Sequence, residues 1–378
     1  MHDRRATAAT LGLCLAASQA ALLVLTPILT SVASDFGVSI ATAGQLRTVS
    51  GLTAGVTAVL SGLLAARVGL RELVAAGVCL LAVGSSLSAV APDFAVLALA
   101  QVPIGIGVGL TYSAAVAAVA EWSKPADRSR VLAVALLGPP LAWVVGMPVG
   151  GAAGEASWRL SWIVVPLVLS VAGLAALSRR DRTPPADVAA SLRTVLDQPA
   201  VVRWSLGELL AYSAWLGVLV FIGALFVEAH GFSVAATGLA LGAAAVMYVP
   251  GNLLFRRWVD AHSRLLLVTL ALACAVVTAA LGAVRPNAWV SFALFGTLAF
   301  LAGGRTLAGS ARGLNLAPAL RLGVTGLRTA ALQFGSFVGA AVGGVALAAG
   351  GFTAAGLAFA GLFAAAAIPH LRASTLPA

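Results

Sequence analysis

The chain has 378 residues, of which 60% are hydrophobic and only 10% are charged, and its mean hydropathy is +1.01. Soluble domains carry about 25% charged residues, so this composition excludes a water-soluble globular protein and indicates a surface that mostly faces lipid. The net charge of +10 would suggest a nucleic-acid partner in a soluble protein, but here the arginines form short clusters between apolar runs. That pattern is typical of membrane proteins, and no nucleic-acid partner is expected.

Apolar runs long enough to cross a bilayer, about 20 residues each, recur along the chain. The first half holds six: Leu11–Val32, Ala43–Leu64, Leu73–Ala91, Phe94–Ala118, Val131–Ala153 and Trp158–Leu177. The second half holds six more: Trp204–Val227, Ala235–Leu254, Leu265–Val284, Ala288–Gly309, Val324–Ala349 and Phe352–Ile368. The first run exceeds the length of a signal-peptide core and is interpreted as a span. The predicted fold class is all-α integral membrane, with twelve transmembrane helices in two six-helix bundles.

A long polar stretch divides these two sets of spans. Residues 178–203 are rich in arginine, aspartate and proline, which is typical of a linker, with room for a short amphipathic helix around Val188–Leu196. The predicted domains are therefore an N-terminal bundle over residues 1–177, a cytoplasmic linker over 178–203 and a C-terminal bundle over 204–378.

The arginines predict the topology. With the amino end inside, every even-numbered loop carries arginines, whereas the odd-numbered loops hold Arg159 and Arg285 alone. Because basic loops stay in the cytoplasm, we expect a multi-pass protein of a cell membrane, bacterial from its composition, with both termini cytoplasmic. A monomer is expected. The three cysteines lie within apolar runs and are interpreted as small apolar residues.

A short repeat supports an internal duplication. Across the end of the second span the chain reads Gly62-Leu-Leu-Ala-Ala-Arg67, and across the end of the eighth it reads Gly251-Asn-Leu-Leu-Phe-Arg256. The two segments occupy the same point in the two halves of the chain, as expected for a duplicated transporter. We predict that they are equivalent under superposition of the halves.

With these features the chain resembles the major facilitator superfamily, in particular its proton-coupled drug and sugar-efflux branch. The loop after the second span of that family reads Gly-x-Leu-x-Asp-Arg-x-Gly-Arg-Arg. Here Gly62, Arg67, Gly69 and Arg71 match this motif, while Ala66 replaces its aspartate. The resemblance implies a major facilitator fold in which this loop acts as a gate between the bundles.

The fifth span is similar to the glycine- and proline-rich motif of the antiporter branch, through Gly146, Pro148, Gly150 and Gly151. These residues either bend and pack the helix or set the direction of transport. In the fourth span Gln101 stands where the drug-efflux branch usually has an arginine, so proton coupling, where present, must use other groups.

Ionisable residues inside a span are costly and are functional candidates by default. Glu208 in the seventh span and Arg305 in the tenth are the proton-coupling candidates, and Arg47 in the second either has a function or extends toward headgroups. The resemblance implies that the first, fourth, seventh and tenth spans line a central cavity. Glu208, Tyr212 and Trp215 share one helix face, which suits either a substrate path or interfacial anchoring.

Further polar and aromatic side chains lie within spans, where each could bind substrate or hold helices together. With Tyr212 and Trp215, the substrate-cavity candidates are Gln19, Gln101, Tyr112, Tyr248, Asn252 and Gln333.

No ATP-binding, metal-binding or nucleophile motif occurs, so no cofactor, metal or enzymatic activity is expected. The sequence favours a secondary transporter that moves a small molecule by alternating access, most simply by proton-coupled efflux. The alternative is uptake or facilitated diffusion of a metabolite. A membrane-embedded enzyme or a non-transporting receptor is the rival from another class.

Overall fold

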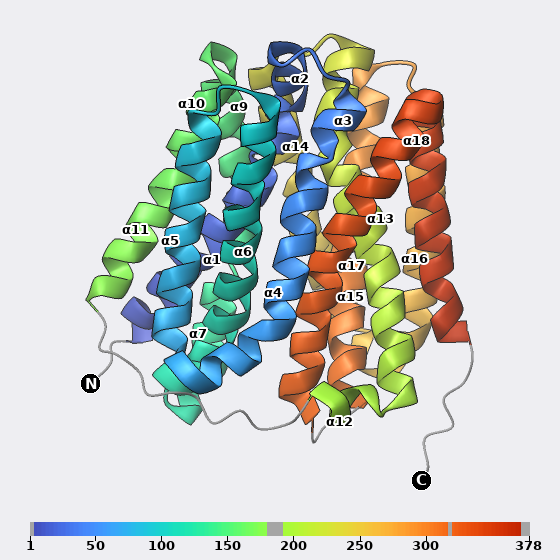
Figure 1. Ribbon diagram of the computed structural model, residues 1–378. Helices are drawn as coiled ribbons and strands as arrows, with labels where there is room; N and C mark the ends of the chain where they lie inside the picture. The colour runs from blue at the N-terminus through green and yellow to red at the C-terminus, as the bar shows by residue number, and fades with distance from the viewer. Residues whose placement is uncertain (1–3, 180–191, 317–319, 372–378) are drawn as a thin grey trace. The chain divides into compact units, whose positions relative to one another are not determined.

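The computed structural model describes residues 4–179, 192–316 and 320–371, and within these ranges every regular element is a helix (Figure 1). The contacts divide the chain into two compact units. Unit 1 comprises Met1–Val188 with Ile222–Gly242, and unit 2 comprises Ala189–Phe221 with Ala243–Ala378. The predicted bundles, 1–177 and 204–378, remain a prediction, because this division groups Ile222–Gly242 with unit 1.

The helices of the first half all belong to unit 1. They are α1 (Arg4–Leu23), α2 (Leu25–Asp35), α3 (Ile40–Gly44), α4 (Leu46–Val68), α5 (Leu70–Ala89), α6 (Phe94–Trp122), η1 (Pro125–Asp127), α7 (Arg128–Ala135), α8 (Gly138–Val144), α9 (Gly146–Ala156), α10 (Trp158–Trp162), the π-helical η2 (Ile163–Leu167) and α11 (Val168–Ser178).

The second half is built from fewer and longer helices. They are α12 (Leu192–Leu196), α13 (Pro199–His230), α14 (Val234–Ala245), α15 (Tyr248–Phe255), α16 (Val259–Ala283), α17 (Ala288–Leu316) and α18 (Arg321–Leu371). Most of the predicted linker lies outside the described residues. The short helix predicted at Val188–Leu196 overlaps α12, and its remainder lies outside them as well.

The described helices supply twelve spans. Ten helical stretches are long and apolar enough to cross a membrane. Helix α4 has 23 residues and is about 34 Å long, which also suffices for a bilayer core of about 30 Å. The last stretch, Gly323–Leu371, bends at Gly350 and Gly351 and therefore supplies two spans. The prediction of an all-α membrane protein with twelve spans is confirmed.

Proline and glycine explain the breaks within spans. Pro139 and Pro140 begin α8, and Pro166 lies in the π-helical segment η2. Proline has no backbone N–H and clashes with the preceding turn, so a helix bends or changes its hydrogen-bond pattern there. Gly351 has a φ of 64°, a left-handed conformation that favours glycine and turns the chain back on itself.

One end of each unit gathers the basic segments. In unit 1, Arg4 pairs with Asp127 at 3.1 Å, and Nη2 of Arg71 donates to the carbonyl oxygen of Leu177 at 3.3 Å. These contacts place the start of α1, the start of α5, η1 and the end of α11 at one end. In unit 2, Nε of Arg264 donates to the carbonyl oxygen of His370 at 2.7 Å, which joins the start of α16 to the end of α18.

The other end of unit 1 has its own polar contacts. Nη1 of Arg159 lies 2.8 Å from Oδ2 of Asp35, which also accepts a bond of 3.0 Å from the indole of Trp158. Nη2 of Arg159 donates to the carbonyl oxygen of Ala91 at 3.1 Å. The first, third and sixth spans are therefore joined here.

Candidate functional site

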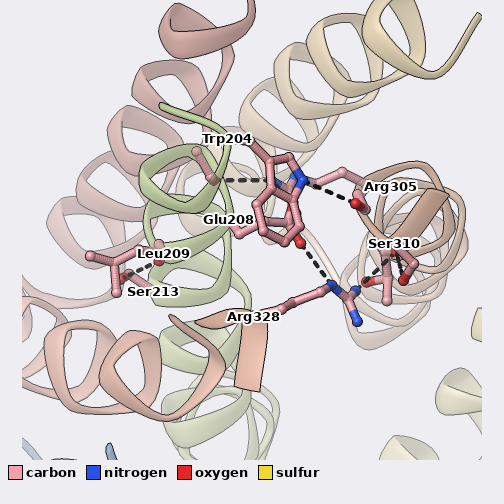
Figure 2. A network of polar contacts seen from close by, with 10 residues as sticks. Trp204, Glu208, Leu209, Ser213, Arg305, Ser310 and Arg328 are labelled. Carbon is pink, nitrogen blue, oxygen red and sulfur yellow. Dashed lines mark hydrogen bonds and ion pairs between the residues drawn. The ribbon is translucent and has the colours of Figure 1, made fainter. Parts of the chain in front are cut away.

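Glu208 is the centre of a charged network buried inside unit 2 (Figure 2). Its side chain, on α13, is 0% exposed. Nη2 of Arg305, on α17, lies 2.9 Å from Oε1, and Nε of Arg328, on α18, lies 3.1 Å from Oε2. Three helices that are distant in the sequence thus meet at one carboxylate, and we call these three residues the charge triad.

Each arginine of the triad also binds backbone. Nη2 of Arg305 donates to the carbonyl oxygen of Gly207 at 3.0 Å, and Nη2 of Arg328 donates to that of Thr306 at 3.0 Å. Arg305 is 3% exposed and Arg328 is 24% exposed. Charges in a low-dielectric interior are tolerated when they are paired and hydrogen-bonded, which both arginines are. The triad carries a formal charge of +1, because two cations share one anion.

Glycines on α17 make room for the triad. A side chain at Gly309 would place its Cβ 2.6 Å from Oε2 of Glu208, closer than real Cβ contacts allow. The carbonyl oxygen of Gly309 accepts a bond of 3.0 Å from the indole of Trp204, which is 2% exposed. A Cβ at Gly313 would meet the Trp204 ring at 2.7 Å. The spacing of these small residues therefore lets α13 and α17 approach closely at the level of Glu208.

An aromatic face continues from the triad along α13. The Arg328 guanidinium lies 5.5 Å from the ring centroid of Tyr212, within the range of a cation–π contact. Trp215 stacks on Tyr248 at 6.3 Å and on Phe295 at 6.2 Å between ring centroids. The predicted shared face of Glu208, Tyr212 and Trp215 thus faces groups of α15, α17 and α18 within unit 2.

Two of the predicted cavity glutamines have different surroundings. Gln333 on α18 is 1% exposed, and its Nε2 has no hydrogen-bond partner among the described residues. Such a buried donor is costly unless something binds it. Nε2 of Gln101 instead donates to Oγ of Ser88 at 3.3 Å and to the carbonyl oxygen of Leu97 at 3.2 Å, so it joins α6 to α5.

The remaining cavity candidates belong to different units, with Gln19 and Tyr112 in unit 1 and Asn252 in unit 2. Gln19 is buried on α1 in unit 1, and Tyr112 packs against the apolar core of that unit. Asn252 lies on α15, which packs closely against α17. A Cβ added at Gly303 would lie 3.2 Å from the backbone nitrogen of Asn252. Arg47 is buried on α4, also in unit 1.

The predicted gating loop connects α4 to α5. Gly62 and Arg67 are exposed, and Gly69 ends α4 with a φ of 89°, which favours glycine. Nη1 of Arg71 lies 3.5 Å from Oε1 of Glu72. The repeated segments lie at matching places in their units, since Gly62–Arg67 closes α4 and Gly251–Arg256 closes α15. Their superposition stays a prediction.

The glycine- and proline-rich fifth span packs closely against α14. A Cβ at Gly151 would meet the Cα of Gly238 at 2.9 Å, and one at Gly242 would meet Pro148 at 2.6 Å. A Cβ at Gly146 would lie 3.3 Å from Val165, a tight contact, and one at Gly150 would lie 3.7 Å from the same side chain, an ordinary contact. Oε2 of Glu155, at the end of α9, accepts a bond of 2.9 Å from the backbone nitrogen of Ala235. The motif therefore forms a helix contact within unit 1.

Arg328 is the member of the triad that the sequence analysis missed. It is not among the predicted site residues, although it lies inside the predicted span Val324–Ala349. A position inside a span marks an arginine as a candidate for the buried network, and this was the signal in the sequence. No described group of three histidine, cysteine or acidic residues could hold a metal ion.

Twelve helical spans define a polytopic membrane protein, and three of them enclose the charge triad. Residues 11–204, slightly more than half of the chain, match the family model described as the Major Facilitator Superfamily, and the chain belongs to this family of membrane transporters.

Three similar proteins illustrate the relationship. The uncharacterized MFS-type transporter EfpA of Mycobacterium tuberculosis is 33% identical over 162 residues, which are 41% of this chain and 31% of EfpA. The crystal structure of a bacterial homologue of the human lysosomal transporter Spinster superposes with a TM-score of 0.79 at 17% identity and covers 98% of this chain and 96% of that one. A D-xylose–proton symporter gives a TM-score of 0.76 at 17% identity and covers 98% and 97%. The two structures support the fold.

Proposed function

We propose that the protein is a secondary active transporter that exports a small molecule by alternating access, driven by a proton that binds Glu208. The observation that carries this proposal is the fully buried carboxylate held by arginines from two other helices. Ionisable groups inside a membrane protein are retained where they serve ion pathways. The proposal includes an orientation with both termini and the 178–203 linker in the cytoplasm. The distribution of arginines supports this orientation.

The coupling follows from the charges of the triad. A proton on Glu208 removes the only anion of the triad, so both ion pairs are lost and two guanidinium groups are left facing each other. Arginine does not give up its own proton, so the carboxyl group alone changes charge. Protonation therefore favours arrangements in which α17 or α18 moves away from α13. Proton binding and helix arrangement are thermodynamically linked, as a coupled transporter requires.

A substrate with an anionic part fits the same charges. When Glu208 is protonated, Arg305 and Arg328 leave a formal charge of +2 that a carboxylate or phosphate of the substrate can balance. The unpaired Nε2 of Gln333 and the aromatic face of Tyr212 and Trp215 add a donor and a stacking surface on the same unit.

The fifth span supports export as the direction of transport. Its glycine- and proline-rich motif resembles that of antiporters and forms the close contact with α14. Facilitated diffusion or uptake is the second candidate. It is favoured by Ala66, which replaces the acid of the gating loop, and by Gln101, which replaces a basic residue and is used in helix packing.

The test is flux in proteoliposomes with an imposed pH gradient, after a compound screen has supplied a substrate. Glu208→Gln keeps the shape of the side chain and cannot titrate. We expect it to abolish accumulation driven by the gradient while exchange of labelled for unlabelled substrate continues. Glu228→Gln, at the exposed far end of α13, is the matched control and should behave as wild type. Accumulation by the Glu208→Gln variant at the wild-type level would reject Glu208 as the coupling group and favour facilitated diffusion or another ion.

A further inference from the structure

A second group of cations surrounds a pocket at the basic end of unit 2, separate from the charge triad. It is lined by Ala200, Arg203, Trp204, Arg264, Arg312, Leu316, Pro369 and His370. These residues come from α13, α16, α17 and α18, so four helices contribute to one small hollow. Three of the lining side chains are arginines and none is acidic.

Hydrogen bonds to the backbone hold Arg264 in place. Nε of Arg264 donates to the carbonyl oxygen of His370 at 2.7 Å, and its Nη2 bonds the carbonyl oxygen of Leu371. These two bonds fix the plane of the guanidinium beside the pocket. Like charges that share a small space repel each other, and an anion between them removes that cost.

His370 is the buried polar residue of the lining. It lines the pocket, is 6% exposed, and its Nε2 has no hydrogen-bond partner among the described residues. This nitrogen lies against Gly207, where an added Cβ would be 2.5 Å from it, so the imidazole closes the inner wall of the pocket.

We propose that this pocket binds a phosphate group. Guanidinium groups match the geometry of phosphate oxygens and bind them through paired hydrogen bonds. The pocket lies at the end of unit 2 that carries the basic loops, which is the level of lipid headgroups in the leaflet that those loops face. Basic pockets between transmembrane helices at this level bind anionic headgroups. The ligand is therefore the phosphate of an anionic phospholipid or a soluble phosphate.

The pocket is connected to the triad through short contacts. The indole of Trp204 bonds the carbonyl oxygen of Gly309, the residue that packs against Glu208. His370 packs against Gly207, whose carbonyl oxygen binds Arg305. A bound phosphate ties α13, α16, α17 and α18 together and should raise the thermal stability of the folded protein.

The experiment measures thermal stability of the full-length protein with two probes. One arm compares nanodiscs of phosphatidylcholine with nanodiscs that also contain phosphatidylglycerol. The other arm titrates inorganic phosphate into the protein in detergent, at constant ionic strength. Arg312→Gln removes a charge from the half-buried part of the pocket, and Arg203→Gln removes one from an exposed side chain of its lining. Arg257→Gln is the matched control, an exposed arginine of the same unit that does not line the pocket.

We expect the stabilisation to weaken in Arg312→Gln and Arg203→Gln, with the apparent affinity falling about tenfold, and to persist in Arg257→Gln. If only phosphatidylglycerol stabilises the protein, the pocket is a lipid site. If only inorganic phosphate stabilises it, the pocket is a site for soluble phosphate. If both stabilise it, the pocket recognises the phosphate group itself. The proposal is overturned when neither probe stabilises the wild type. It is equally overturned when the control variant loses as much as the two pocket variants, because the attraction is then a general effect of positive charge.

Discussion

Removing the carboxylate of the charge triad should destabilise unit 2 more than removing either arginine. Glu208→Gln leaves Arg305, which is 3% exposed, and Arg328, which is 24% exposed, without their shared anion. Breaking a buried ion pair by deleting one partner costs about 3–5 kcal/mol. Arg305→Gln should cost less, about 1–3 kcal/mol, because Arg328 still lies 3.1 Å from Glu208 and only part of the carboxylate loses its partner.

The double variant separates pairing from simple loss of a side chain. In Glu208→Gln with Arg305→Gln, the remaining cation is Arg328, whose partial exposure lets water solvate it. The two changes should therefore cost less together than their sum, by about 1–3 kcal/mol.

Thermal unfolding in detergent is the assay, with Glu228→Gln as the control for a lost exposed carboxylate. For a folding unit of this size, 1 kcal/mol corresponds to about 2–4 °C, so Glu208→Gln should lower the Tm by on the order of 10 °C. The reasoning is refuted when Glu208→Gln melts within about 2 °C of the control, or when the two costs are strictly additive.

Two other predictions concern packing and topology. Gly309→Ala should displace the Glu208 carboxylate, since the new Cβ would lie 2.6 Å from Oε2, and should lower the Tm in line with an overpacking cost of about 1–3 kcal/mol. Gly326→Ala is the control, because a Cβ there would meet nothing within 4 Å, and it should leave the Tm unchanged. Equal effects of the two substitutions on the Tm would contradict the close packing at Gly309. In a variant without the native cysteines, single cysteines at positions 184–187 should react only with a membrane-permeant reagent, whereas Ala229→Cys should also react with an impermeant one. Labelling of 184–187 from outside would reverse the proposed orientation.

The spans were predictable because a lipid environment leaves few options. Backbone groups in a bilayer need internal hydrogen bonds, so each apolar run of sufficient length becomes a helix. The positions of charged residues and glycines in the sequence indicate where each helix ends. The merged helix Gly323–Leu371 illustrates this, since the predicted spans Val324–Ala349 and Phe352–Ile368 meet at the turn formed by Gly350 and Gly351. Helix boundaries inside spans, such as those at Pro139 and Pro166, change the bending but not the number of crossings.

The partners of polar side chains could not be predicted in the same way. Periodicity places Glu208, Tyr212 and Trp215 on one face of α13, but it does not say which helix that face meets. Gln101 shows the limit, because the residue type alone leaves open a substrate contact or the bond to Ser88 that the structure contains. Arg328 lies 120 positions from Glu208, and only the three-dimensional arrangement of α13 and α18 brings them together.

A simple electrostatic rule nevertheless narrows the search for such partners. A charge inside a span is tolerated where another charge or a hydrogen-bonding group balances it, so an acid and the arginines within the predicted spans of one bundle are candidates for each other. For the second bundle the rule selects Glu208, Arg305 and Arg328, since Arg328 falls within Val324–Ala349. A residue one turn inside a span can reach a buried carboxylate through its long side chain, as Arg328 does.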